Sequence, residues 1–198
     1  MKELLIATGN QGKMKEFAAL FSVLPVRLYS LKDFPDLVPA AEDGETFAAN
    51  ALQKAWNACV ATGIPVIADD SGLCVDALQG RPGVHSARYA GPNAGDADNN
   101  DKLLEELAGV SLSGRTAAFH CVIALCTPEG EPRTFSGRLC GVILEAAAGG
   151  GGFGYDPLFL VPEYGKTLAE LPIKVKNRIS HRGSAAALLK DYLQRICR

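Results

Sequence analysis

The chain opens with an apolar run that gives way to a glycine-rich turn and then to helical spacing, and this order limits its fold more than any other feature. Residues 4–7 predict a short buried strand, and apolar residues at helical spacing from Met14 to Phe21 predict an amphipathic helix. A strand that passes through such a turn into a helix directs backbone N–H groups and the positive end of the helix dipole at one point. The turn therefore predicts a phosphate-binding site made of Thr8, Gly9, Asn10, Gln11, Gly12 and Lys13.

The turn is not a P-loop, in which four residues separate the glycines and Ser or Thr follows the lysine to hold magnesium. Here two residues separate Gly9 from Gly12, and Met14 follows Lys13. If this turn binds the phosphates of a nucleotide, other residues must hold any metal ion.

The rest of the chain predicts further helices and strands. Helices are expected at 46–59, 98–107 and 184–196, and two extended runs at 117–127 and 133–142 predict a β-hairpin around Pro-Glu-Gly-Glu. Strands alternate with helices at first and pair as a hairpin later. The sequence therefore predicts an α/β protein with a mixed sheet.

Length and composition are those of a globular enzyme. The chain has 198 residues, which suits one domain, with 47% apolar and 21% charged residues. Its 20 basic and 22 acidic residues give a net charge of −2, which argues against a nucleic-acid partner but not against a small anionic ligand. Six scattered cysteines without a CxxC pair, and a first apolar run too short for a signal peptide or a membrane span, predict reduced thiols in a cytoplasmic protein.

Three acidic residues are candidate metal ligands. We expect a short apolar strand to end at Asp69 and Asp70, the position at which open α/β sheets bind ligands. Adjacent carboxylates there could hold Mg²⁺, and one could take a proton from water. A solvated turn is the alternative. Glu42 precedes the helix at 46–59, where it could instead be a surface charge favoured by the helix dipole.

Two further segments could bind the rest of a nucleotide. Glycines at 149–152 lead into Phe153, Gly154, Tyr155 and Asp156, where a backbone could approach a flat ligand closely while a ring stacks on it. A packed structural turn is the alternative. A basic cluster, which could bind a phosphate or remain a solvated face, contains Lys174, Lys176, Arg178, His181 and Arg182. Together with the first turn and the carboxylates, these segments supply what a nucleoside triphosphate requires.

Five segments in this order resemble the inosine-triphosphate pyrophosphatase (Ham1-like) family: TGNQGK, ADDSGL, PGVHSARYAG, GGFGYDPLF and ISHRG. The resemblance implies a single domain over residues 1–198, with an elongated mixed sheet flanked by helices and two lobes around a deep central cleft. It also implies a homodimer that hydrolyses XTP, ITP and dITP with Mg²⁺ to the monophosphate and pyrophosphate. Such an enzyme removes deaminated purines from the nucleotide pool.

The matching motifs imply a role for each candidate residue. Asp70 is the catalytic base and a metal ligand, Lys13 is catalytic, and Glu42 is a second metal ligand. The implied substrate-binding residues are Thr8, Gly9, Asn10, Gln11, Gly12, Lys13, Ser71, Phe153, Gly154, Tyr155, Asp156, Lys176, His181 and Arg182. The chain departs from the family at Lys174 and Val175, where relatives carry acidic residues before the lysine that aligns with Lys176.

Selection of deaminated purines requires a hydrogen-bond donor that faces the 6-oxo group of the base. Arg182, His181 or the backbone of residues 153–155 could supply it. Two other functions stay open at this point: a regulator that binds the nucleotide without hydrolysing it, and a pyrophosphatase for another nucleotide. A scaffolding protein would leave the polar turns unexplained. Replacement of Asp70 by Asn would separate an enzyme from a regulator.

Overall fold

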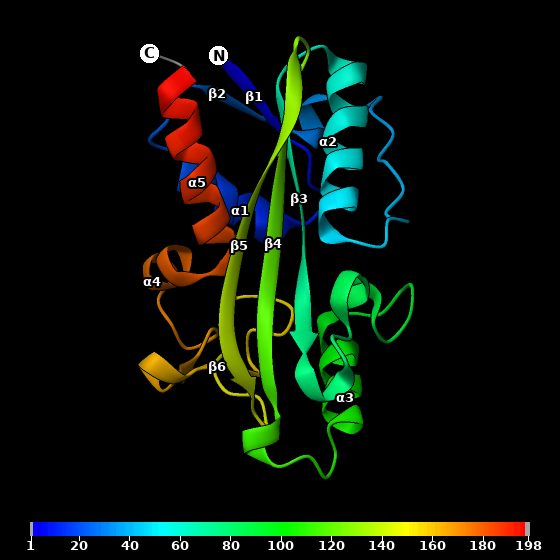
Figure 1. Cartoon of the computed structure of the whole chain (residues 1–198), viewed down its shortest axis with the longest axis vertical. Helices are drawn as coiled ribbons and strands as arrows, with labels where there is room; N and C mark the ends of the chain where they lie inside the picture. Colours follow the sequence, from blue (N-terminus) through cyan, green and yellow to red (C-terminus); the bar gives the residue numbers. More distant parts are fainter. Residues whose placement is uncertain (1, 197–198) are drawn as a thin grey trace. The chain divides into compact units, whose positions relative to one another are not determined.

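The computed structural model describes residues 2–196 (Figure 1). The strands are β1 (Glu3–Ile6), β2 (Arg27–Ser30), β3 (Val66–Val75), β4 (Thr116–Thr127), β5 (Gly130–Ile143), β6 (Phe159–Val161) and β7 (Lys166–Thr167). The α-helices are α1 (Gln11–Phe21), α2 (Phe47–Thr62), α3 (Asp96–Glu106), α4 (Ile173–Ile179) and α5 (His181–Ile196). Short 3-10 helices are η1 (Leu31–Asp33), η2 (Asp76–Leu78), η3 (Gly83–Arg88), η4 (Leu112–Gly114) and η5 (Pro162–Tyr164).

The seven strands form one sheet in the order β2-β1-β3-β4-β5-β6-β7. β1 pairs in parallel with β2 and with β3, whereas β6 pairs antiparallel with β5 and with β7. The sheet is therefore mixed, and the predicted α/β class is confirmed. The predicted hairpin is also present, since only Pro128 and Glu129 separate β4 from β5.

The chain divides into two compact units. The first unit contains the described residues up to Asp70, residues 121–137 and those from Arg182 onward. The second unit contains residues 71–120 and 138–181. The strands β3, β4 and β5 contribute residues to both units.

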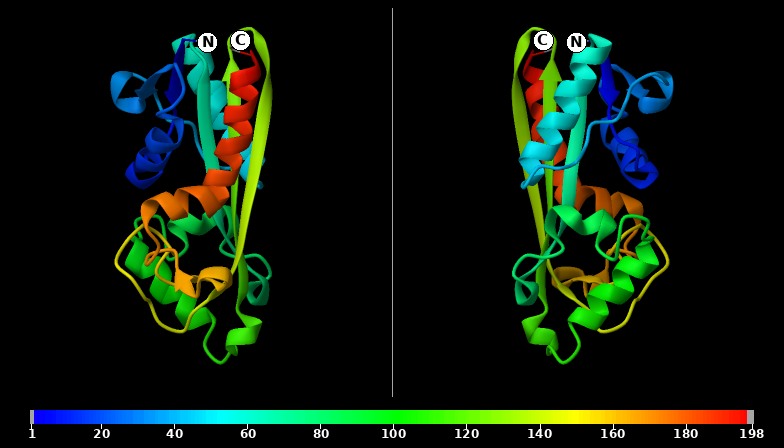
Figure 2. Two further views of the ribbon diagram at one scale, coloured as in Figure 1. Left: turned by 90° about the vertical axis from the view of Figure 1, so that its left-hand side faces the viewer. Right: turned by 90° about the vertical axis from the view of Figure 1, so that its right-hand side faces the viewer.

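The first unit has helices on both faces of its strands (Figures 1 and 2). Leu4 and Ile6 point to one face, where α1 and α5 cover them with Phe17 and Leu189. The alternate residue Leu5 points to the other face, where the alanine-rich side of α2 covers it. This alternation follows from the twofold side-chain period of a strand, and it produces two apolar layers.

The second unit has its own apolar core. Leu73 and Val75 of β3 pack in one cluster with Phe119 of β4, with Leu103 of α3 and with Leu107, the C-cap of that helix. Leu103 and Leu107 are both fully buried, as their spacing predicts. This core also contains residues 155, 158 and 159, which follow the glycine-rich segment.

The structure corrects two predicted boundaries. β3 does not end at Asp69 and Asp70 but continues to Val75, so both aspartates lie inside the strand and are buried. A strand tolerates them because charged partners meet each carboxylate on its own face of the sheet. The last helix begins earlier than predicted, at His181, so His181 and Arg182 belong to its first turn rather than to the segment before it.

Residues 2–196 contain no helix that is both long and apolar enough to cross a membrane. The five cysteines in that range are free thiols, as predicted, and Cys197 lies outside the described residues.

Candidate active site

The glycine-rich turn forms the start of α1. Asn10 is the N-cap of the helix, and its side-chain oxygen accepts a hydrogen bond from the backbone N–H of Lys13 at 3.0 Å. The hydroxyl of Thr8 accepts one from the N–H of Asn10 at 3.3 Å. Gln11, Gly12 and Lys13 thus form the first turn of α1, where a helix has N–H groups without intrahelical partners and favours anions.

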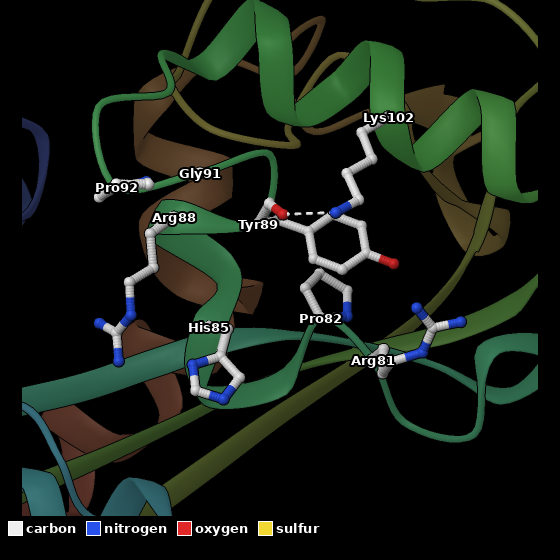
Figure 3. Close-up of a pocket in the computed structure, with 8 residues that line it drawn as sticks. All are labelled: Arg81, Pro82, His85, Arg88, Tyr89, Gly91, Pro92 and Lys102. Atoms are coloured by element: carbon white, nitrogen blue, oxygen red, sulfur yellow. Dashed lines mark hydrogen bonds between the residues drawn. The ribbon is translucent and has the colours of Figure 1, made fainter.

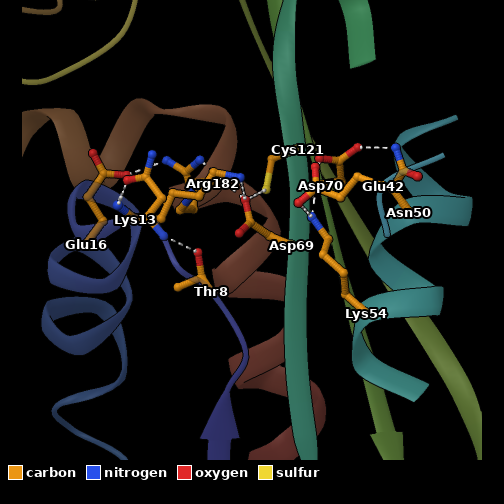
Figure 4. Close-up of polar contacts among 11 residues, drawn as sticks. Thr8, Lys13, Glu16, Glu42, Asn50, Lys54, Asp69, Asp70, Cys121 and Arg182 are labelled. Atoms are coloured by element: carbon orange, nitrogen blue, oxygen red, sulfur yellow. Dashed lines mark hydrogen bonds and ion pairs between the residues drawn. The ribbon is translucent and has the colours of Figure 1, made fainter. Parts of the chain in front are cut away.

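On one face of β3, Asp69 lies in a buried network of charges (Figure 4). Its Oδ2 is 2.9 Å from Nζ of Lys13 and 3.4 Å from Nη2 of Arg182. Arg182, whose side chain is 1% exposed, also donates to Glu16. Burial alone would raise the pKa of Asp69, but the charges of Lys13 and Arg182 outweigh burial and hold that pKa well below its usual range. Asp69 is therefore an ionised anchor for two cations.

On the opposite face, Asp70 points toward α2 (Figure 4). Nδ2 of Asn50 donates to its Oδ2 at 2.9 Å, and Nζ of Lys54 lies 3.4 Å from its Oδ1. Asn50 is fully buried, and its Oδ1 accepts from the N–H of Gly44 at 2.8 Å, which holds the segment with Glu42 against α2. Burial raises the pKa of Asp70 although the charge of Lys54 opposes it. Asp70 is thus easier to protonate than Asp69.

Asp70 and Glu42 converge on a single positive charge. Nζ of Lys54 lies 3.1 Å from Oε1 of Glu42 as well as 3.4 Å from Oδ1 of Asp70. Within residues 2–196, no three His, Cys, Asp or Glu side chains are grouped as metal ligands. Mg²⁺ needs no such group, because it commonly binds one or two carboxylates together with substrate phosphates. The ammonium of Lys54 already lies between the two carboxylates, so this pair fits a cation.

In the second unit, Asp156 fixes the glycine-rich segment. Its Oδ2 accepts from Nζ of Lys176 at 2.6 Å and from the backbone N–H of Phe153 at 2.8 Å. The same Nζ lies 4.7 Å from the centre of the Phe153 ring. Gly152 has a φ of +75°, and an added Cβ there would overlap Oδ2 of Asp156. The buried ion pair between Asp156 and Lys176 therefore holds the Phe153 segment in place, and only glycine fits at position 152.

Three other predicted residues of the second unit have defined surroundings. His181 stacks on Phe119 with ring centres 4.8 Å apart and planes 10° apart. The hydroxyl of Tyr155 donates to the carbonyl of Ser86 at 2.8 Å. Ser71 is half-buried in β3, directly after Asp70.

The predicted site residues fall into two sets. The first unit holds Thr8, Gly9, Asn10, Gln11, Gly12, Lys13, Glu42, Asp70 and Arg182, and the second holds Ser71, Phe153, Gly154, Tyr155, Asp156, Lys176 and His181. Within each unit, ion pairs join several of these residues. Lys174, which departs from the family pattern, is exposed on α4, whereas Lys176 on the same helix is buried.

Three functional candidates were not predicted from the sequence: Asn50, Lys54 and Glu16. Asn50 and Lys54 are four residues apart on α2, so both point toward Asp70. Glu16 follows Lys13 by one helical turn. None of the three lies on the apolar face that the sequence predicts for its helix, so the helical pattern alone gave no signal for them.

Comparisons with known sequences agree with the five motifs. The sequence model of the Ham1 family matches residues 4–192. A protein of Geobacter sulfurreducens named dITP/XTP pyrophosphatase is 60% identical over 193 residues, a match that covers 98% of this chain and 97% of that protein. A protein of the same name from Geobacillus kaustophilus is 55% identical over 197 residues, covering 99% and 96%. The predicted resemblance is confirmed.

Solved structures give the same result for the fold. A HAM1 protein from Coxiella burnetii has a TM-score of 0.90 and 42% identity, with 98% of this chain and 100% of that chain covered. A protein of Mycobacterium abscessus described as nucleoside-triphosphatase / dITP/XTP pyrophosphatase has a TM-score of 0.76 and 43% identity, with 94% and 97% covered.

Proposed function

Because the chain belongs to the Ham1 family, we propose that it is a nucleoside-triphosphate pyrophosphatase for deaminated purine nucleotides. It hydrolyses XTP, dITP and ITP to the monophosphate and pyrophosphate, and so removes these purines from the nucleotide pool. The observation that carries this proposal is the convergence of Asp70 and Glu42 on one positive charge, in the unit that also contains the first turn of α1. The names of the two full-length relatives support the same substrate class.

The proposed cofactor is Mg²⁺, held by Asp70 and Glu42. When bound, it would neutralise charge on phosphate oxygens and make a nearby water more acidic. The two carboxylates are already held by Lys54 and Asn50, so little reorganisation is needed to receive a cation. With a metal ion bound between the carboxylates, the ammonium group of Lys54 would turn toward either the phosphates or the carboxylates.

Asp70 is the proposed general base. A water oxygen attacks the α-phosphorus, Asp70 accepts a proton from that water, and the bond to the bridging oxygen of the β-phosphate breaks. Pyrophosphate leaves and carries the electrons of that bond. A pKa raised by burial suits this role, because a more basic carboxylate takes the proton more readily.

The first turn of α1 is proposed to bind the triphosphate. Thr8, Gly9, Asn10, Gln11, Gly12 and Lys13 would line the phosphates, with backbone N–H groups from Gly9, Gln11 and Gly12 and the ammonium group of Lys13. The N–H groups of Thr8, Asn10 and Lys13 already donate within the turn. Positioning and charge stabilisation do most of the work in phosphoryl transfer. Asp69 contributes by anchoring Lys13 and Arg182, so it orients the proposed phosphate-binding cations without contacting the reacting atoms.

The second unit is proposed to bind the nucleoside. Its residues would be Ser71, Phe153, Gly154, Tyr155, Asp156, Lys176 and His181. The N–H groups of Phe153 and Gly154 already donate to Asp156 and Asp96. Of the backbone N–H groups of residues 153–155, that of Tyr155 is therefore the proposed donor for the 6-oxo group, with the side chain of His181 as the other proposed donor. Arg182, the remaining candidate, already donates to Glu16 and Asp69.

The family resemblance supports three further proposals. The chain is a homodimer in the cytoplasm, and its single domain has two lobes around a deep cleft. Neither nucleic acid nor a membrane is a proposed partner. A nucleotide-binding regulator is disfavoured because Asp70, Glu42 and Lys13 are all retained.

A substrate panel tests the proposal directly. XTP, dITP, ITP, ATP and GTP are incubated with the enzyme, with and without Mg²⁺, and pyrophosphate and orthophosphate are measured separately. We expect Mg²⁺-dependent pyrophosphate from the three oxo-purines and little from ATP or GTP. Orthophosphate alone would contradict attack at the α-phosphorus, and tight binding without turnover would favour a regulator.

A further inference from the structure

Helix α3 holds both polar groups of the backbone at Gly154. Oδ2 of Asp96 accepts from the N–H of Gly154 at 2.6 Å, and Nδ2 of Asn100 donates to its carbonyl at 3.0 Å. Asp96 and Asn100 are four residues apart in α3, so their side chains lie on the same face of the helix. Gly154 has a φ of +61°, a left-handed backbone conformation that glycine adopts readily.

The helix that holds Gly154 is itself fixed to the second unit (Figure 3). On its C-terminal half, Oε2 of Glu106 accepts from the Tyr89 hydroxyl at 2.6 Å and lies 2.8 Å from Nη1 of Arg81. Nζ of Lys102 donates to the Tyr89 carbonyl at 2.8 Å and lies 4.7 Å from the Tyr89 ring centre. Leu103 beside them is fully buried. These contacts hold α3 in place within the second unit.

These contacts also engage two of the cationic side chains of a pocket of about 300 Å³ that η3 and α3 line (Figure 3). Arg81 and Lys102 line it, and both lie within 4 Å of the carboxylate of Glu106. Their positive charge is thus used to dock α3, and we assign this pocket no ligand.

The residues on both sides of Gly154 are held independently. The N–H of Phe153 donates to Asp156, and Asp156 is paired with the buried Lys176. The hydroxyl of Tyr155 is fixed on a backbone carbonyl of η3. Gly154 lies between these anchors, and its peptide groups are the part of the segment that α3 alone secures.

We propose that Asp96 and Asn100 are positioning residues that pre-organise residues 153–156 for the purine base. The inference rests on the proposed function only because that function assigns the purine base to residues 153–156. A segment that is ordered before binding loses less conformational entropy when the nucleotide binds, so pre-organisation increases affinity. Asp96 and Asn100 contact neither the phosphates nor the water in this assignment. Their loss weakens nucleotide binding and leaves the chemical step unchanged.

Single substitutions separate the two contacts. Asp96→Ala removes the acceptor for the Gly154 N–H, and Asn100→Ala removes the donor to its carbonyl. We expect each to raise the KM for dITP and XTP roughly tenfold with kcat changed less than twofold, because the segment loses one hydrogen bond that orders it before the nucleotide binds. Asp96→Asn retains an acceptor oxygen, so we expect it to restore most of the lost affinity.

Two carboxylates on the same helix provide matched controls. Asp98 bonds to the N–H of Gly95 at 2.8 Å, so Asp98→Ala removes a charge and a helix-capping contact from the same turn without touching Gly154. Asp101 is exposed, and Asp101→Asn removes a charge alone. If Asp96→Ala acted only by weakening α3, Asp98→Ala would reproduce its effect on KM.

Ligand binding without turnover tests the inference apart from the proposed function. Calorimetry with inosine monophosphate and with inorganic pyrophosphate is expected to show roughly tenfold weaker monophosphate binding by Asp96→Ala and unchanged pyrophosphate binding. Amide hydrogen exchange is expected to be faster at Gly154 in that variant. Equal KM values for Asp96→Ala and Asp98→Ala, or a loss of kcat at unchanged KM, would overturn the inference. Absence of dITP hydrolysis by the unaltered enzyme would instead overturn the proposed function.

Discussion

The two units hold their candidate residues by different means. In the first unit, cations and carboxylates alternate: Lys13 and Arg182 meet Asp69, and Lys54 joins Asp70 to Glu42. In the second unit, one buried ion pair and a set of hydrogen bonds fix the backbone of residues 153–156. The first arrangement controls charge, and the second controls the shape of a short segment.

The difference separates two kinds of experimental effect. Substitutions in the charged network of the first unit are expected to change kcat, metal dependence or pH dependence, because these follow from charge at the reacting atoms. Substitutions around residues 153–156 are expected to change KM or folding stability.

The largest effect is expected at Asp70. Asp70→Asn retains the shape of the side chain but removes the proposed base, and we expect kcat for dITP to fall by roughly 10²–10⁴, the usual contribution of a general base. Affinity for inosine monophosphate should change little. A variant that keeps more than a tenth of the original kcat would show that another group takes the proton.

In the second unit, the largest effect is expected on stability. Lys176→Met leaves the carboxylate of Asp156 buried without its cation, which costs about 3–5 kcal/mol in unfolding free energy. Urea unfolding measures this loss. The double variant Lys176→Met with Asp156→Asn is the control, since it removes the unpaired charge and should recover much of the stability. No recovery would mean that the packing of Lys176, rather than its charge, matters.

Lys54 tests whether the cation between Asp70 and Glu42 positions them. Lys54→Met should lower kcat/KM by on the order of a hundredfold, because the two carboxylates then repel and move. The charge of Lys54 lowers the pKa of Asp70, so its removal should raise that pKa and shift the acid limb of the pH–rate profile to higher pH. A lower rate with an unshifted profile would contradict this electrostatic role.

Glu42 is expected to affect metal dependence more than the maximal rate. Glu42→Gln should raise the Mg²⁺ concentration for half-maximal activity at least roughly tenfold, with much of kcat recovered at high Mg²⁺. Asp43→Asn is a matched control, because it removes a neighbouring exposed charge. Equal Mg²⁺ dependence in the two variants would exclude Glu42 as a ligand.

The smallest effect is expected in the acid stability of the unaltered protein. The pKa of Asp69 is lowered in the folded state, so near pH 4 the unfolded chain binds the proton that the folded chain does not. Stability from this group is thus present at neutral pH and falls with decreasing pH, by up to about 1.4 kcal/mol per pH unit. Asp69→Asn should show a shallower fall between pH 5 and 3 in urea titrations, and an equal slope would contradict the assignment.

Local patterns predicted much of the fold. Thr46 is the N-cap of α2, and Gly63 is its C-cap with a left-handed backbone conformation. Such end signals can be read from the sequence because hydroxyl capping and glycine termination depend on neighbouring residues only. The predicted end of β3 was wrong because it depends on residues that are distant in the sequence. Two adjacent aspartates usually end a strand, and only distant partners, such as Lys13 for Asp69, allow the strand to continue.

For the candidate site, too, only features that depend on neighbouring residues could be predicted from the sequence. Residues in recognisable motifs were predicted, whereas Lys54 and Asn50 were not, since a helix pattern gives a face but not what that face meets. The role of Asp96 was also hidden. Its contact with Gly154 joins residues 58 positions apart, and no local pattern relates them.

The position of attack is the most direct test of the account. The enzyme hydrolyses dITP in water enriched in oxygen-18, and mass spectrometry locates the label in the two products. Attack at the α-phosphorus with Asp70 as base predicts one labelled oxygen in dIMP and none in pyrophosphate. Label in pyrophosphate would place the attack at the β-phosphorus and contradict the assigned geometry of Asp70 and the phosphate-binding turn.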